Sequence, residues 1–189
     1  MTTLRFTTKD LEALPDPLDD TRYEIIGGEL YVSKQPSLEH QFASDSACAA
    51  LRSWSADTGQ GCAFSAPGVI FAEDDNVAPD VVWLSNERLR RAMGDDGKLH
   101  QAPELMIEVL SPGTSNQQRD RDIKLKLYSR RGVEEYWLLD YEERIVHLYR
   151  RDGEALRLAA TLTADDTLQS PLLPDFSQRV GDLFFTREL

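Results

Sequence analysis

A single carboxylate interrupts one of the most apolar segments of the sequence. Residues 102–113 read APELMIEVLSPG, and Glu108 lies in the middle of an apolar run that Pro112 and Gly113 close. Such a run, bounded by proline and glycine, predicts a buried strand. A carboxylate in an apolar interior is costly unless it is paired with a cation, protonated or bound to a metal. We therefore expect Glu108 to have a chemical role.

Two further side chains are candidates to act together with Glu108. Asp80 opens another apolar segment directly after Pro79, and Lys124 lies on the helix expected after the Glu108 strand. Paired carboxylates suit Mg²⁺, which prefers oxygen ligands and keeps waters or phosphate oxygens in its shell. A bound metal activates water and stabilises charge on a phosphate under attack, and a nearby lysine could orient or deprotonate that water. These are the parts that a phosphodiesterase needs.

Each of these residues also has a simpler interpretation. Asp80 could start a strand or cap a turn. Lys124 follows Asp120 by four positions, which is an ordinary favourable pair on a helix surface. Glu108 could point into solvent from one side of its strand. The residues around it are apolar at both alternating positions, however, which favours a strand that is buried on both faces.

Periodicity and turn residues predict the elements that must position these side chains. In chain order we expect a short capped helix at residues 8–14, a hairpin at 22–33, a helix at 38–57, one or two strands at 61–72, a strand up to residue 84, a short helix at 86–93, a strand at 105–110, a helix at 116–131, a strand at 133–140 and a hairpin at 144–162. The apolar tail at 172–183 is expected to pack back on the core.

The Glu108 strand, the helix after it and the next strand form a strand–helix–strand unit. A right-handed crossover between two parallel strands is the expected geometry of such a unit. Because hairpins precede and follow this unit, the sheet must also contain antiparallel pairs. We therefore predict an α/β or α+β domain with a mixed sheet and with hairpins near both ends of the chain.

Composition places the chain among globular proteins. Its 189 residues fit one domain with a real core, predicted to span residues 1–189, and 41% of them are hydrophobic and 29% charged. No apolar run approaches the length of about 18 residues that a transmembrane helix needs. The start, MTTLRFTTKDLEALPD, does not resemble a secretory signal. The two cysteines, Cys48 and Cys62, have no metal-type spacing. We expect a cytoplasmic protein that does not enter a membrane.

The charge of the chain gives a mixed indication about whether it binds nucleic acid. The formal net charge of −12 argues against nonspecific binding, which depends on neutralising phosphates. Residues 119–131, RDRDIKLKLYSRR, nevertheless hold six basic and two acidic side chains. This segment could steer a polyanion to one face of the molecule, or it could be an ordinary solvated helix face. Charge alone favours the second interpretation.

The chain resembles the Uma-two endonuclease family, a branch of the PD-(D/E)XK restriction-endonuclease-like superfamily. The segments that carry the resemblance are RYEIIGGELYV, SLEHQ, VAPDVVWLSNERL, APELMIEVLSPGT, DRDIKLKLY and GVEEYWLLD. The resemblance runs over about residues 22–183, nearly the whole chain. It implies a restriction-endonuclease-like core, in which helices flank a mixed β-sheet.

The resemblance also implies a set of site residues. Asp80 matches the first acid of the family motif and Glu108 the second, and the backbone carbonyl of Val109 is a further expected metal ligand. The parent motif has its lysine two residues after the second acid, where this chain has Leu110. The matching lysine is Lys124, on the following helix. The implied cofactor is Mg²⁺ or Mn²⁺.

Two accessory residues complete the expected site. His40, near the start of the long helix, matches a recurrent family position and could approach the metal or the substrate. Its simpler interpretation is a helix residue that makes a local hydrogen bond. Asp120, one helical turn before the lysine, is the second accessory candidate.

The function implied is a metal-dependent endonuclease that hydrolyses phosphodiester bonds, with DNA as the expected substrate. A homodimer is expected because enzymes that cut both strands often pair two active sites. The alternative is a binding module that keeps the fold without cutting, which the net charge of −12 supports. A third interpretation, glycoside hydrolysis by paired carboxylates, needs an open aromatic groove. The tryptophans Trp54, Trp83 and Trp137 instead fall in predicted helices or strands, where they are expected in the core.

Overall fold

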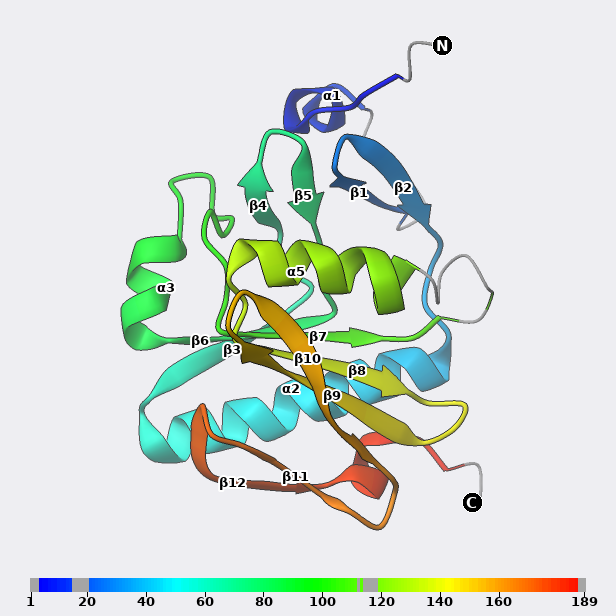
Figure 1. The fold of residues 1–189 in the computed structure, drawn as a ribbon, viewed down its shortest axis with the longest axis vertical. Coiled ribbons are helices and arrows are strands. Elements are labelled where there is room, and N and C mark those ends of the chain that lie inside the picture. The colour runs from blue at the N-terminus through cyan, green and yellow to red at the C-terminus, as the bar shows by residue number, and fades with distance from the viewer. Residues whose placement is uncertain (1–3, 15–20, 112, 114–118, 187–189) are drawn as a thin grey trace.

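The computed structural model describes residues 4–14, 21–111, 113 and 119–186, and within them a mixed six-stranded sheet forms the central layer (Figure 1). Its strands, in spatial order, are β10 (Ala155–Leu162), β9 (Ile145–Asp152), β8 (Glu135–Asp140), β7 (Leu105–Val109), β6 (Val81–Ser85) and β3 (Gly61–Ser65). β7 and β8 are parallel, and the other neighbours are antiparallel. The predicted mixed sheet and the parallel pairing around Glu108 are therefore confirmed.

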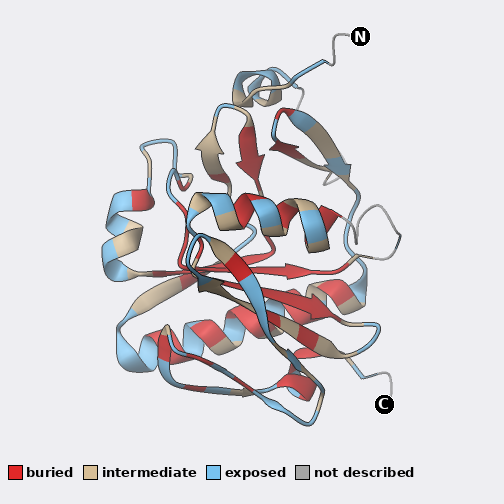
Figure 2. Cartoon of the chain, viewed as in Figure 1, coloured by how far each residue is buried: buried red, intermediate tan, exposed pale blue. Residues whose placement is uncertain are grey.

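Helices cover both faces of this sheet. The long helix α2 (Leu38–Thr58) packs on one face, and α5 (Leu125–Arg131) packs on the other (Figure 1). Residues of β7 alternate between the two cores, so that Ile107 contributes to the α2 side and Met106 to the α5 side. β7 and β8 are buried along their whole length (Figure 2). The carboxylate of Glu108 thus lies in a strand without a solvent face.

The predicted helix at 116–131 has two parts in the structure. Residues 116–118 lie outside the described residues, η1 (Arg119–Lys124) is a π-helix, and α5 continues to Arg131. Gly132 ends the helix in the left-handed conformation, with φ of 82°. The wider π turn was not predicted, because periodicity alone does not separate it from an α-helix.

A four-stranded sheet lies at the end of the molecule near the N-terminus (Figure 1). Its strands are β2 (Glu29–Ser33), β1 (Arg22–Ile26), β5 (Asp75–Val77) and β4 (Val69–Ala72). The predicted hairpin of β1 and β2 is confirmed. Gly27 and Gly28 have φ of 57° and 78°, which suits glycine in a tight hairpin turn. The short strand β5 was not predicted.

The C-terminal part packs against the α2 side of the core. The predicted hairpin of β9 and β10 is confirmed, and β11 (Thr167–Ser170) and β12 (Leu173–Arg179) form a further hairpin that was not predicted. The 3₁₀ helix η2 (Val180–Leu183) follows. Leu173, Phe176 and Val180 are buried beside α2 residues, as expected for the tail.

The remaining helices are short. α1 (Thr8–Glu12) begins with a capping box at Thr7, and α3 (Asn86–Ala92) follows β6. The three tryptophans are buried in the core, as predicted, so they do not line an open aromatic groove. None of the helices in the described ranges is both long and apolar enough to span a bilayer.

Candidate active site

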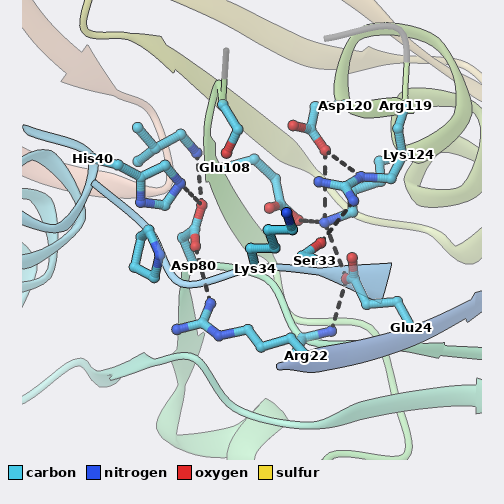
Figure 3. Close-up of a pocket in the computed structure, with 14 residues that line it drawn as sticks. Arg22, Glu24, Ser33, Lys34, His40, Asp80, Glu108, Arg119, Asp120 and Lys124 are labelled. Atoms are coloured by element: carbon cyan, nitrogen blue, oxygen red, sulfur yellow. Dashed lines mark hydrogen bonds and ion pairs between the residues drawn. The ribbon is translucent and has the colours of Figure 1, made fainter. Parts of the chain in front are cut away.

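The predicted site residues meet in one pocket beside the end of β7. The pocket lies between the β1–β2 hairpin, the start of α2, the residue before β6, and η1 (Figure 3). Asp80, Glu108, Lys124, His40 and Asp120 all line it. Segments far apart in the sequence therefore come together around the carboxyl group of Glu108.

Asp80 lies directly before β6 and is anchored from three sides. Oδ2 accepts the backbone N–H of Val109 at 2.8 Å and lies 3.3 Å from Nε2 of His40. Oδ1 lies 3.4 Å from the guanidinium of Arg22. The antiparallel pairing of β6 and β7 sets Asp80 opposite the end of β7, which explains its contact with Val109.

The environment of Asp80 favours its charged form. Burial opposes ionisation, but the hydrogen bond and charge of His40, the N–H of Val109 and the charge of Lys124 outweigh it and lower the pKa of Asp80. His40 is itself buried, and its Nδ1 has no hydrogen-bond partner among the described residues. His40 therefore orients Asp80 in this structure, in addition to donating its backbone N–H to the cap residue Ser37.

The side chain of Glu108 points to the α5 side of the sheet, where its carboxyl group is paired. Its Oε1 accepts hydrogen bonds from Nζ of Lys124 at 2.9 Å and from the hydroxyl of Tyr128 at 2.5 Å. Burial raises the pKa of Glu108 to about 8; the charge of Lys124 opposes this rise, whereas Asp80 and Asp120 add to it. The carboxylate is thus tolerated in an apolar strand because two donors converge on it.

Lys124 is a buried cation surrounded by carboxylates. Its ammonium lies 2.9 Å from Glu108, 3.0 Å from Glu24 and 3.8 Å from Asp120. Burial lowers the pKa of Lys124, but the charges of Glu108 and Glu24 raise it by more. The net shift of the pKa is therefore upward, and the amine stays protonated. Because Lys124 is only 2% and Asp120 only 1% exposed, the interpretation of these two residues as a surface pair is wrong.

The π-helical turn η1 brings three charged side chains to the pocket. Arg119, Asp120 and Lys124 are all buried, and all three line the pocket. Nε of Arg119 binds Oδ1 of Asp120 at 3.1 Å, and the carbonyl of Asp120 accepts the hydroxyl of Tyr136 at 3.0 Å. Short π-helical segments occur frequently at functional sites.

Two buried members of this cluster were not predicted from the sequence. Glu24, on β1, is 3% exposed, and its Oε1 accepts the backbone N–H of Ala78 at 3.0 Å. Arg119 is 8% exposed and donates to Oγ of Ser33 at 2.9 Å. Glu24 had a usable signal, since it is a carboxylate in a strand with apolar neighbours. The position of Arg119 depends on the packing of η1 against the hairpin, which the sequence does not reveal.

The donor set suits a hard divalent cation. Asp80 and Glu108 supply carboxylate oxygens in the same pocket, and Val109 lies beside them. Across the described ranges, no group of three or more His, Cys, Asp or Glu side chains is arranged to hold a metal. Mg²⁺ is nevertheless commonly bound by one or two carboxylates, together with other oxygen ligands, waters and substrate oxygens. The residues present therefore fit the implied Mg²⁺ or Mn²⁺.

Comparison with solved structures supports this architecture. A "putative nuclease belonging to DUF820" from Anabaena variabilis matches with a TM-score of 0.75 and 21% identity, over 95% of this chain and 97% of that chain. At that identity the likeness shows a shared fold. The type IIG restriction endonuclease BpuSI matches at a TM-score of 0.37 and 16% identity, over 80% of this chain and 16% of that chain, too weakly to carry an argument.

Comparison with curated proteins finds no match. A family model with the description "Putative restriction endonuclease" matches residues 8–181, which is most of the chain. This match confirms the resemblance carried by the motifs around Asp80 and Glu108, and together with the fold it supports a nuclease in general terms. The chain belongs to the Uma2 family.

Proposed function

We propose that this chain hydrolyses phosphodiester bonds of nucleic acid with the help of Mg²⁺ or Mn²⁺, and that its substrate is DNA. The observation that carries the proposal is the pocket in which Asp80, Glu108 and the buried ammonium of Lys124 meet. Two carboxylates and a fixed cation in one pocket match the needs of phosphoryl-transfer chemistry, which depends on positioning and on charge stabilisation.

The roles of the residues follow from their environments. Asp80 and Glu108 would hold the divalent cation together with the carbonyl of Val109. The cation would supply Lewis acidity toward water and phosphate oxygens. Because the amine of Lys124 stays protonated, it would donate a hydrogen bond to the attacking water or to a phosphate oxygen. Lys124 is therefore proposed as a positioning and charge-stabilising group and not as a general base.

Cationic side chains at the pocket would allow an acidic protein to bind a polyanionic substrate. Arg22, Lys34 and Arg119 line the pocket, and Lys34 is exposed (Figure 3). Arg119 is buried and pairs with Asp120, and Arg22 lies 3.4 Å from Asp80, so Lys34 is the exposed cation of these three. A protein with a net charge of −12 would then bind nucleic acid at this pocket and not along its general surface.

Cleavage of supercoiled plasmid tests the proposal directly. The wild type is expected to nick or linearise the plasmid with Mg²⁺ or Mn²⁺ and to stop when a chelator is added. Asp80→Asn and Glu108→Gln are expected to lower the rate by roughly a hundredfold or more, because each removes a charged ligand. The matched control is Asp45→Asn, an exposed carboxylate on α2 that should cleave like the wild type.

The outcome also separates cleavage from binding. Cleavage that persists in both Asp80→Asn and Glu108→Gln would place the chemistry elsewhere. Binding of DNA without cleavage under any metal condition would favour the alternative function, a module that keeps the nuclease fold and does not cut.

A further inference from the structure

We propose that Glu24 is a positioning residue that fixes the ammonium of Lys124 relative to the segment carrying Asp80. This inference rests on the proposed nuclease function for its consequence in catalysis. Its structural part, the hold of Glu24 on Lys124, can be tested in the protein without metal or substrate.

One oxygen of Glu24 joins two separate segments of the pocket. Oε1 accepts the backbone N–H of Ala78 at 3.0 Å, and the same atom lies 3.0 Å from Nζ of Lys124. Ala78 stands two residues before Asp80, and Lys124 ends η1. Glu24 itself is 3% exposed on β1, so its side chain is held by packing. It therefore sets the spacing between the Asp80 segment and the lysine.

The contacts of Lys124 make Glu24 its second anchor. Asp120, at 3.8 Å, is beyond hydrogen-bond distance from the ammonium, which leaves Glu108 and Glu24 as the close carboxylates. Oε1 of Glu108 is shared with the hydroxyl of Tyr128. A fully buried ammonium needs a charged partner that stays in place. Glu24 supplies that partner when Glu108 also binds the proposed divalent cation.

Two other roles for Glu24 make different predictions. As a purely structural clamp, it would act only through the N–H of Ala78. An amide oxygen replaces that acceptor, so Glu24→Gln would behave as the wild type in every respect. As a third metal ligand, Glu24 would be required for metal affinity in the same way as Asp80 and Glu108. The positioning role predicts that Glu24→Gln keeps the metal and the fold but changes the lysine.

The first readout is the ¹H–¹⁵N NMR signal of the Lys124 ammonium in the metal-free full chain. A buried, hydrogen-bonded ammonium exchanges slowly enough to be seen, and its loss in Lys124→Arg assigns the signal. Glu24→Gln is expected to shift or broaden this signal. Glu29→Gln, an exposed carboxylate on the other strand of the same hairpin, is expected to leave it unchanged.

The second and third readouts are metal affinity and kinetics. Calorimetric titration of Mn²⁺ into Glu24→Gln is expected to give an affinity within about threefold of the wild type. On DNA, kcat is expected to fall roughly tenfold to a hundredfold with KM little changed, because the loss falls on transition-state stabilisation. Glu29→Gln should match the wild type in both measurements.

The results that would overturn the proposal are distinct. An unchanged Lys124 signal in Glu24→Gln excludes the positioning role. A loss of Mn²⁺ affinity as large as that in Asp80→Ala makes Glu24 a metal ligand instead. If wild-type protein cleaves no DNA, the proposed function fails, and the NMR signal and Mn²⁺ affinity still decide whether Glu24 positions Lys124.

Discussion

Glu108 illustrates how a buried charge is accommodated at the scale of one residue. Its strand is buried along its whole length, and its carboxyl group is accommodated there because Lys124 and Tyr128 both donate to one oxygen. The two carboxylates of the pocket are tuned in opposite directions: the pKa of Asp80 is lowered and that of Glu108 is raised. Opposed shifts within one pocket are typical of sites that handle protons or metals.

The raised pKa of Glu108 predicts how stability depends on pH in the metal-free protein. Between the ordinary value of 4.5 and about 8, the folded state holds a proton on Glu108 that the unfolded state has lost. The contribution of Glu108 to the free energy of unfolding therefore falls as pH rises through this window, by at least about 1 kcal/mol, and is constant above it.

Urea denaturation of the wild type and of Glu108→Gln at a series of pH values measures this contribution. The difference between the two free energies isolates Glu108 from Asp120 and Glu135, whose pKa values burial also raises. A difference that stays constant between about pH 4.5 and about pH 8 would show that the pKa of Glu108 is not raised.

Lys124 is expected to matter for catalysis more than for folding. Lys124→Gln removes the cation, but Glu108, whose pKa is raised to about 8, is protonated in the metal-free protein below that pH, so the chain should still fold. We expect the rate of DNA cleavage to fall roughly a hundredfold or more, the size seen when one transition-state donor is lost. Lys126→Gln, an exposed lysine on α5, is the matched control for plasmid cleavage. Equal rates for the two variants would contradict the role of Lys124.

At the scale of elements, the four-stranded sheet is attached to the rest of the molecule by charge as well as by packing. Asp75, on β5, is 2% exposed, and its Oδ1 accepts the backbone N–H of Gly27 at 2.7 Å. Its Oδ2 pairs with Arg131 and Arg130 at the end of α5. Since β1 of this sheet carries Glu24, the attachment helps to hold the hairpin over the pocket.

Asp75→Asn is expected to lower the free energy of unfolding by about 2 kcal/mol. Breaking a buried ion pair is strongly destabilising, but Arg131 reaches solvent and part of the effect is screened. The neighbouring Asp74→Asn is the control, because its pair with Arg5 is exposed on both sides and should change stability by less than about 0.5 kcal/mol. Urea denaturation that gives equal losses for the two variants would contradict the proposed attachment.

Local patterns predicted the elements with strong signals of their own. The apolar run around Glu108, the Gly27-Gly28 turn and the periodicity of α2 are visible in short windows, and each prediction is confirmed. Strand β5 has three residues and gives no periodic signal. The π turn of η1 and the pairing of β11 with β12 depend on packing between distant segments, which a single sequence does not show.

The residues of the site likewise divide into those that the sequence predicted and those that it did not. The resemblance named Asp80, Glu108 and Lys124, and the structure brings all three into one pocket, although their roles stay predictions. Arg119 was missed because η1 and the β1–β2 hairpin meet only in the folded chain, whereas Glu24, a carboxylate between apolar residues of a strand, could have been found. The metal, the DNA specificity and the expected homodimer likewise stay predictions.

At the scale of the whole molecule, an acidic protein brings a few cationic side chains to one pocket. The net charge is −12, whereas Arg22, Lys34 and Arg119 gather around the pocket. Binding of a nucleic acid should therefore involve few phosphates. We expect the plot of log affinity against log salt concentration to have a shallow slope of about −3, because each neutralised phosphate contributes about −0.9.

Lys34→Gln tests this localised binding. Within the described residues, Lys34 is exposed at the pocket and has no ion pair, so its loss should reduce the salt slope by about one unit. Fluorescence anisotropy with a short labelled duplex, without divalent metal, measures the slope. Lys126→Gln should keep the wild-type slope. An equal change in both variants would mean that binding is spread over the surface.

Calorimetric titration of Mn²⁺ and Mg²⁺ tests most directly whether Asp80 and Glu108 hold a divalent cation. The wild type is expected to bind about one ion per chain in this pocket, and Asp80→Ala and Glu108→Ala are each expected to lose that binding, because two carboxylates are the charged ligands of the site. Binding that survives both substitutions would contradict the assignment, because the ion would then lie elsewhere on the acidic surface.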